Sequence, residues 1–211
     1  MACFRSTVDS GLLREALKGK TKEQELVIKY FVDAGGCLSF IGIGRPMKDA
    51  EYEQMLFRRR DSMDYRAKAI GKIGLDEDQI REIPPAHFEG YHFEDSYAKK
   101  TAKGNWVSSA YQMAWLFFSS EQVYLYRYIF NMDRDDYFER TDEFFYKDVT
   151  SFTTSSETET AHGLGEKKFT VQTNKFAMVV PGDKIYVSLE GVKNSEATIQ
   201  AMKQKLREKK M

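Results

Sequence analysis

The chain has 211 residues, of which 42% are hydrophobic and 14% aromatic, enough for a sizeable core in one large or two small domains. Its 32 basic residues balance its 32 acidic ones, so the whole surface carries no net field to attract nucleic acid or an anionic membrane. Cys3 and Cys37 lack CxxC spacing, which excludes a disulfide framework and favours a reducing, cytoplasmic location. The start of the chain lacks a signal-peptide core, and the longest apolar run, 113–118, is too short to span a membrane.

The first half of the chain shows helical patterning. Thr21 and Gln24 form a capping box, and the apolar residues after them recur every three or four positions until Gly35 and Gly36. This pattern predicts a helix with one buried face. The apolar segment CLSFIGIGRPM follows and is interrupted by glycine, which indicates a buried crossing or a short strand.

A second amphipathic pattern begins near Asp49. Its apolar stripe has mixed charges on the other faces, so we expect one helix that ends near Gly71 or Gly74. A further capping box over 76–79 predicts a short third helix, which the two prolines at 84–85 terminate.

Residues 86–104 are interpreted as a linker or long loop, because the hydrophobic period changes to two beyond them. We therefore expect a helical N-terminal region over 1–104 and a β-rich domain over 105–211. The alternating runs that predict strands lie at 111–118, 123–130, 143–146, 149–157, 167–173, 175–180 and 184–189. The first two runs flank a short turn and predict a hairpin. A final amphipathic helix begins at Asn194 or Ser195.

The phrases SSEQVYLYRYIF, EFFYKDVTSFTTSS, KIYVSLEG and NSEATIQAMKQKLREKK give the region 105–210 a resemblance to the bacterial pleckstrin-homology-like domains. The resemblance implies a bent antiparallel β-barrel that the C-terminal helix caps, whereas the helical N-terminal half resembles no known family. Together these readings predict an α+β protein, in which the helical N-terminal segment packs on the barrel. Members that bind phosphoinositides carry several Lys and Arg residues between their first two strands. The corresponding loop here, 119–122, has none, so we do not expect phosphoinositide binding.

The segment HFEGYHFED contains candidate metal ligands. His87, Glu89 and His92 offer imidazole and carboxylate groups, which are zinc ligands in many proteins. The segment has no cysteine, and no helix fixes the spacing of its histidines. We therefore expect an aromatic-rich packed loop without a metal ion. The alternative is a metal site in which these three residues are the ligands.

Three further patterns point away from an ion site or an enzyme. Asp133, Asp135 and Asp136 lack the glycine and the glutamate of an EF-hand loop and indicate a hairpin turn. The glycines of GGCLSFIGIG lack the order of a dinucleotide-binding fingerprint. Neither cysteine lies beside a histidine, and no G-x-S-x-G motif occurs, so we predict no catalytic residue and no cofactor.

Tyr124, Tyr126 and Tyr128 share one face of a predicted strand, and aromatic residues with a polar end are enriched at interfaces. Either the helical half covers them or a partner does. The preferred function is therefore a non-catalytic binding or scaffolding protein, whose partner is a protein, a peptide or a second copy rather than nucleic acid. The alternatives are a metal-dependent hydrolase that uses HFEGYHFED and a peripheral membrane module that uses the basic C-terminal helix.

Overall fold

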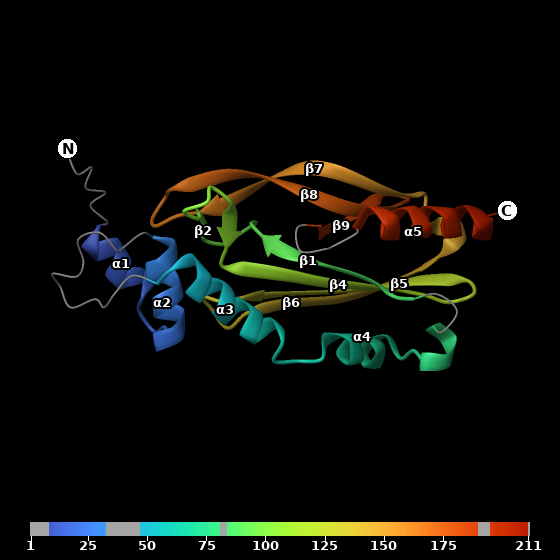
Figure 1. The fold of residues 1–211 in the computed structure, drawn as a ribbon, viewed down its shortest axis with the longest axis horizontal. Helices are drawn as coiled ribbons and strands as arrows, with labels where there is room; N and C mark the ends of the chain where they lie inside the picture. Colours follow the sequence, from blue (N-terminus) through green and yellow to red (C-terminus); the bar gives the residue numbers. More distant parts are fainter. Residues whose placement is uncertain (1–8, 33–46, 81–83, 190–194, 211) are drawn as a thin grey trace.

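The computed structural model describes residues 9–32, 47–80, 84–189 and 195–210 of the chain. Cys3, Cys37 and most of the segment CLSFIGIGRPM therefore lie outside the described residues. The described part has helices and antiparallel sheets, so the predicted α+β class is confirmed. Figure 1 shows a three-stranded sheet, a four-stranded sheet and a layer of helices stacked in that order.

The helices are α1 (Ser10–Ala16), α2 (Lys22–Phe31), α3 (Asp49–Arg60), α4 (Tyr65–Ile73) and α5 (Ser195–Lys210), with 3-10 turns at Glu77–Ile80 and Tyr146–Asp148. The predicted capping box of α2 is confirmed. The N–H of Gln24 donates to the Thr21 hydroxyl at 3.2 Å, and the N–H of Thr21 donates to the Gln24 side chain at 3.0 Å. The short helix predicted from 76 is the first of the two 3-10 turns.

The single helix predicted from Asp49 onward is wrong, because the chain forms α3 and α4 with a turn at 61–64 between them. The carboxylate of Asp64 accepts a hydrogen bond from the N–H of Ala67 at 2.9 Å and so caps the start of α4. Gly74 ends α4, as predicted. Its φ of 76° belongs to the left-handed region that glycine adopts without strain.

The strands are β1 (Ala86–His92), β2 (Ala98–Lys100), β3 (Trp106–Ser108), β4 (Ala110–Phe118), β5 (Gln122–Asn131), β6 (Tyr137–Phe145), β7 (Ser151–His162), β8 (Lys168–Val180) and β9 (Asp183–Ser188). The four-stranded sheet has the order β1-β4-β5-β6, and the three-stranded sheet has the order β7-β8-β9. β2 and β3 form a small hairpin of their own. Every one of these pairings is antiparallel.

β1 corrects the prediction for 86–104. Most of HFEGYHFED is a strand rather than a loop, and it pairs with β4 from Ala86 opposite Leu116 to His92 opposite Ala110. The four-stranded sheet thus takes one strand from the region before residue 104 and three from the region after it.

The hairpin predicted at 111–118 and 123–130 is confirmed by β4 and β5. The two runs predicted at 167–173 and 175–180 are one strand, because Lys175 continues the β8 ladder opposite Ser155. The run predicted at 143–146 is mainly the end of β6.

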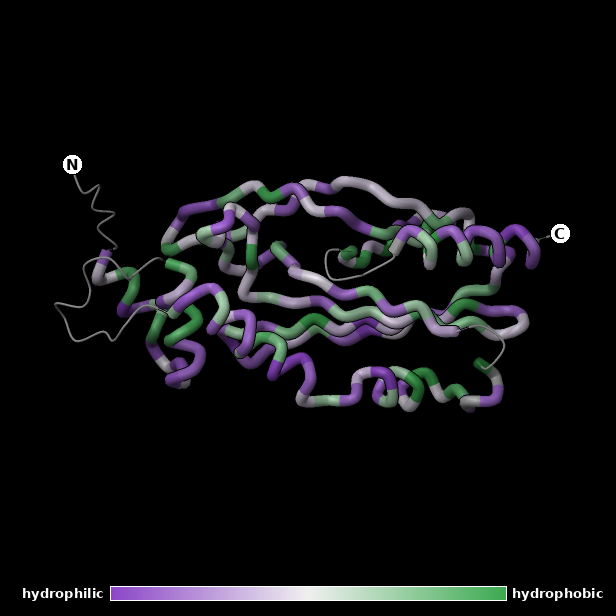
Figure 2. Tube along the Cα trace, in the orientation of Figure 1, coloured by the Kyte–Doolittle hydropathy of each residue, from purple (hydrophilic) through white to green (hydrophobic). Residues whose placement is uncertain are grey.

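Two apolar clusters lie on opposite faces of the four-stranded sheet. The outer cluster joins that sheet to the helices and includes Leu56 of α3, Ala69 of α4 and Tyr126 of β5. Figure 2 shows hydrophobic stretches along the strands of the four-stranded sheet and a hydrophilic C-terminal end of α5. The inner cluster joins the two sheets and α5, and its buried members are Ala86, Phe88, Ala114, Leu116, Phe118, Val123, Leu125, Tyr146, Val149, Phe152, Phe176, Met178, Val180, Ile185, Val187, Ile199, Met202 and Leu206.

Candidate functional site

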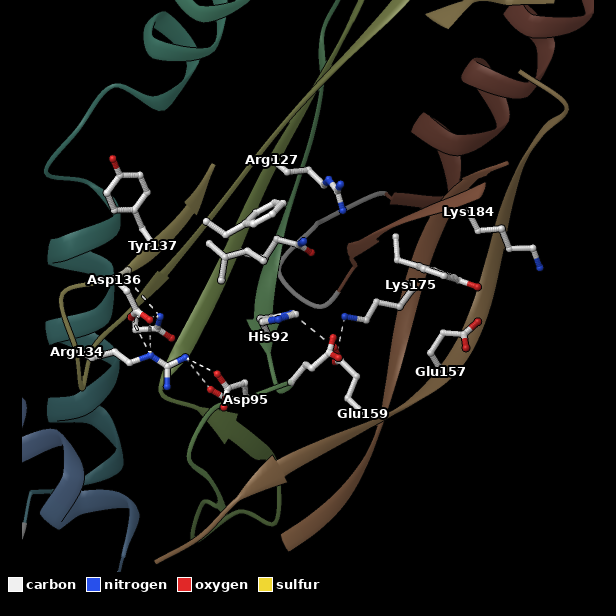
Figure 3. A pocket seen from close by; sticks show the side chains of 16 residues that line it. His92, Asp95, Arg127, Arg134, Asp136, Tyr137, Glu157, Glu159, Lys175 and Lys184 are labelled. Carbon is white, nitrogen blue, oxygen red and sulfur yellow. Dashed lines mark hydrogen bonds and ion pairs between the residues drawn. The ribbon is translucent and has the colours of Figure 1, made fainter. Parts of the chain in front are cut away.

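A polar cavity of about 620 Å³ lies between the two sheets, beside the inner cluster. Figure 3 shows the side chains that line it, which come from β1, β4, β5, β6, β7, β8 and β9 and from the turns next to them. The boundary between the apolar core and the cavity lies along the inner face of β5. Its inward residues Val123 and Leu125 belong to the core, whereas the next two on the same face, Arg127 and Ile129, line the cavity. We call this space the inter-sheet cavity.

Arg127 is a buried charge of the inter-sheet cavity that its neighbours compensate only in part. Its side chain is only 14% exposed, and its Nη2 lies 3.6 Å from Oδ2 of Asp142. Arg140 holds the same carboxylate more closely, with its Nε at 2.7 Å and its Nη2 at 2.6 Å from Oδ1 of Asp142. Within the described part of the chain, the buried Nε of Arg127 has no hydrogen-bond partner. Burial lowers the pKa of the Arg127 guanidinium, and Asp142 opposes that effect without cancelling it.

A second charged group of the cavity consists of Glu159 and Lys175, whose side chains pair with each other. Nζ of Lys175 lies 3.0 Å from Oε2 of Glu159, and the Thr173 hydroxyl donates to the same oxygen at 3.2 Å. Nδ1 of His92 lies 3.5 Å from the other carboxylate oxygen, Oε1, too far for a hydrogen bond. Burial lowers the pKa of His92 to about 4, so its imidazole is neutral at neutral pH.

The third polar group lies at the β5–β6 turn. Arg134 donates through its Nε to the Asp136 carboxylate at 2.8 Å and through its Nη2 to the backbone carbonyl of Asp95 at 2.8 Å. Asn131 donates its side-chain amide to Asp136 at 2.8 Å, and its own buried Oδ1 accepts no hydrogen bond. Two buried polar atoms of cavity-lining residues, Oδ1 of Asn131 and Nε of Arg127, thus have no hydrogen-bond partner among the described residues.

The structure separates the predicted metal ligands. Odd and even residues of β1 face opposite sides of the sheet, so His87 and Glu89 lie on the helical face and His92 lies in the inter-sheet cavity. His87 stacks on Trp115 with ring centroids 4.3 Å apart, and burial lowers its pKa to about 4. Oε1 of Glu89 lies 3.2 Å from Nη1 of Arg60 in α3. These three residues cannot hold one ion.

A different set of possible metal ligands does come together. His92, Glu94 and Glu159 place one ligand atom each within 4.8 Å of one another. One imidazole and two carboxylates suit a divalent transition-metal ion. The ammonium of Lys175, however, already lies on Glu159, so a metal ion would have to displace a buried cation.

The predicted interaction residues are largely covered by the helical layer. Tyr126 and Tyr128 are buried in the outer cluster, whereas Tyr124 is half-buried against it. The Tyr126 hydroxyl donates to Oε1 of Glu139 at 2.8 Å, and Nζ of Lys68 in α4 lies 4.5 Å from the centre of the Tyr128 ring.

The basic C-terminal helix α5 also uses one of its faces to pack against the rest of the protein. The apolar stripe of α5, formed by Ile199, Met202 and Leu206, is buried in the inner cluster. None of the described helices has both the length and the apolarity needed to cross a membrane.

The residues that define the cavity were not singled out by the sequence. Arg127 lies on a strand face that is otherwise apolar, with Leu125 before it and Ile129 after it. A charged residue on an otherwise apolar strand face could have indicated a functional site, because burying an unpaired charge costs folding free energy. Glu159 and Lys175 gave no comparable signal, since they are brought together only by the β7–β8 pairing.

No family model, curated protein or solved structure matches this chain.

Proposed function

We propose that this chain is a non-catalytic binding protein and that the inter-sheet cavity holds its ligand, a small polar molecule with a carboxylate or phosphate group. The single observation that carries the proposal is Arg127. Two arginines share the carboxylate of Asp142, and the one that faces the cavity retains a buried N–H without an acceptor. An anionic group of a ligand would supply that acceptor.

The dimensions and the other polar groups support a small molecule. A volume of about 620 Å³ falls within the ordinary range of small-molecule sites, roughly 300–1,000 Å³. Oδ1 of Asn131 would accept a hydrogen bond from a hydroxyl or amide of the same ligand. The ligand that fits best therefore has an anionic group near Arg127 and a hydrogen-bond donor near Asn131.

The absence of catalysis is part of the proposal and is supported by the lining of the cavity. Among the described residues, no serine, threonine or cysteine lines it. His92 is a weak base with a pKa of about 4, and Lys175 is held in an ion pair. In the part of the chain that the structure describes, the lining therefore offers no hydroxyl or thiol nucleophile of serine, threonine or cysteine and no effective imidazole base.

We further infer that the scaffold is pleckstrin-homology-like, as the resemblance of the sequence implies, and that the protein acts in a reducing cytoplasm. The support for the scaffold is the order of its elements. After the β2–β3 hairpin, the three strands β4–β6 of the first antiparallel sheet are followed by the three strands β7–β9 of the second and then by α5, which packs into the inner cluster. The support for the compartment is the pair of cysteines without CxxC spacing.

The test compares thermal unfolding of the natural protein with that of Arg127→Met and of Lys184→Met, which removes an exposed cation from the same cavity. Inorganic phosphate and citrate are the probes, with sulfate at matched ionic strength to measure the general stabilisation by such salts. We expect a ligand-dependent rise in Tm above the sulfate value that Arg127→Met loses and Lys184→Met keeps. Equal shifts in all three proteins would refute the proposal.

A second candidate function rests on the His92, Glu94 and Glu159 set, which could serve a metal-dependent hydrolase. Isothermal titration with Zn²⁺ or Mn²⁺ separates the two candidates. Stoichiometric metal binding that Glu159→Gln abolishes would favour the metal site, whereas no measurable heat would favour the anion site.

A further inference from the structure

β6 is the last strand of the four-stranded sheet. It pairs with β5 on one side, and among the described residues no strand pairs with it on the other side. A free strand edge presents a row of unpaired backbone donors and acceptors, which is a template for another strand. β6 has nine residues and no proline or lysine. Four of its residues are charged, Glu139, Arg140, Asp142 and Glu143, and such residues hinder pairing with a strand whose charges do not match theirs.

β6 also exposes aromatic side chains. Tyr137 is 59% exposed, Phe138 43% and Phe145 45%, and they are three of the seven large hydrophobic residues classed as exposed in the described part of the chain. All three lie at the two ends of β6, whereas the other four are distributed over α1, α2, α3 and the turn after α3. β6 is therefore the element with the largest share of these exposed apolar residues.

The sequence of β6 is complementary to itself when two copies run antiparallel. With Thr141 opposite Thr141, Tyr137 lies opposite Phe145 and Phe138 lies opposite Phe144. Both pairs join residues on the same face of the extended sheet, as a continuous pleat requires. A shift of two residues in either direction would leave aromatic residues at one end without a partner strand.

The charges of β6 favour the same register. Arg140 lies opposite Asp142 of the second copy, so each inward charge meets its opposite. Glu139 would lie opposite Glu143, but Lys68 and Lys72 already lie 3.0 and 3.4 Å from the Glu139 carboxylate. Arg140 and Asp142 already pair within β6, with 2.7 Å between Nε and Oδ1, so the second copy extends this pair into an alternating row of charges. A strand with like charges at these positions would be repelled, which makes the edge selective.

We infer that β6 is a self-association edge, at which a second copy of this chain adds its own β6 antiparallel to form one continuous eight-stranded sheet. The inference does not depend on the proposed ligand. It does affect the inter-sheet cavity, because Tyr137 and Phe138 line that cavity as well as the strand edge. The second copy therefore covers part of the cavity rim with its Phe144 and Phe145.

The first experiment measures the mass in solution by light scattering over a concentration series. We expect twice the 24.5 kDa of one chain for the natural protein. Tyr137→Lys with Phe145→Lys places like charges opposite each other twice and should weaken the dimer by about tenfold or more. Tyr137→Lys with Phe145→Glu places opposite charges there and should restore the dimer. Both positions are exposed, but Tyr137 also stacks on Tyr128 with ring centroids 5.3 Å apart. Both pairs of changes replace Tyr137 by lysine, so they lose the same contact and the comparison between them isolates the effect of charge at position 145.

The second experiment tests the register. In a background with Cys3 and Cys37 replaced by serine, Thr141→Cys should cross-link to its own copy with a short bismaleimide, because the two Cβ atoms are neighbours at the two-fold axis. Phe145→Cys alone should not, since its neighbour is Tyr137. A natural protein that stays monomeric at every concentration would overturn the inference. So would a dimer that resists the paired lysine changes, or one that Thr141→Cys fails to cross-link.

Discussion

Nζ of Lys175 lies 3.0 Å from Oε2 of Glu159 across the β7–β8 pair, and the two side chains are only 6% and 11% exposed. Glu159 is therefore neutralised inside the cavity by a partner from the neighbouring strand. His92, which faces the other oxygen of the same carboxylate, can remain uncharged.

We predict that Lys175→Met destabilises the protein by about 3 kcal/mol, because it leaves the carboxylate of Glu159 buried without its cation. Urea unfolding at neutral pH measures the change. The double variant Lys175→Met with Glu159→Gln should recover most of the loss, since the unpaired charge is gone. A single variant as stable as the natural protein would show that water reaches Glu159 freely.

Stability should fall as the pH decreases from about 6.5, the ordinary pKa of histidine, towards 4. His87 and His92 have folded-state pKa values of about 4, so between these limits the unfolded chain binds more protons than the folded one. Between pH 6.5 and 5.5 we expect a slope of about 1 kcal/mol per pH unit from His92 and less from the more exposed His87. Burial raises the pKa of Glu89, which opposes the trend at the acidic end of this window.

The check is urea unfolding at several pH values for the natural protein and for His87→Asn with His92→Asn. The double variant loses the stacking of His87 on Trp115 and therefore changes the absolute stability as well, so the slope is the quantity to compare. An unchanged slope in the double variant would contradict the prediction.

Tyr126→Phe should cost about 1–2 kcal/mol, because it removes a hydrogen bond to the carboxylate of Glu139 from a fully buried position. Tyr124→Phe is the matched control, since the Tyr124 hydroxyl bonds the neutral side chain of Gln122 at a half-buried site. We expect the control to lose less than half as much in the same unfolding measurement. If Tyr126→Phe lost no more free energy of unfolding than Tyr124→Phe, Lys68 and Lys72 would be sufficient partners for the Glu139 carboxylate without the tyrosine hydroxyl.

Leu206→Ala should destabilise by about 3 kcal/mol, because Leu206 is buried in the inner cluster and its truncation leaves a cavity under α5. Gln204→Ala on the exposed face of the same helix serves as the control for helix propensity. If both variants unfold at the same urea concentration, α5 does not contribute to the core.

The sequence predicted those elements whose signals are local. The α2 capping box and the hairpin of β4 and β5 each depend on residues a few positions apart, and both are confirmed. β1 was missed because its residues satisfy distant partners: Glu89 meets Arg60 of α3, and Phe88 stacks on Phe176 of β8 with ring centroids 4.8 Å apart. Nothing within HFEGYHFED itself indicates those contacts.

The candidate site was less predictable than the fold, because it depends on which strand face each residue occupies. His87 and His92 are close in sequence, yet an odd separation along a strand places them on opposite faces. Arg127 and Lys175 are 48 positions apart in the chain, yet both line one cavity. Short spacing along the sequence draws attention to His87 and His92, which lie on opposite faces. It gives no indication that Arg127 and Lys175 line the same cavity.

The position of β1 also bears on how the molecule unfolds. Its Phe88 belongs to the inner cluster and its Tyr91 packs on the outer one, so a single strand ties both apolar clusters together. Loss of that strand would open the edge of β4 and expose both clusters at once. We therefore expect one calorimetric transition for the whole chain rather than two, and a fragment that begins at residue 105 should aggregate instead of folding alone.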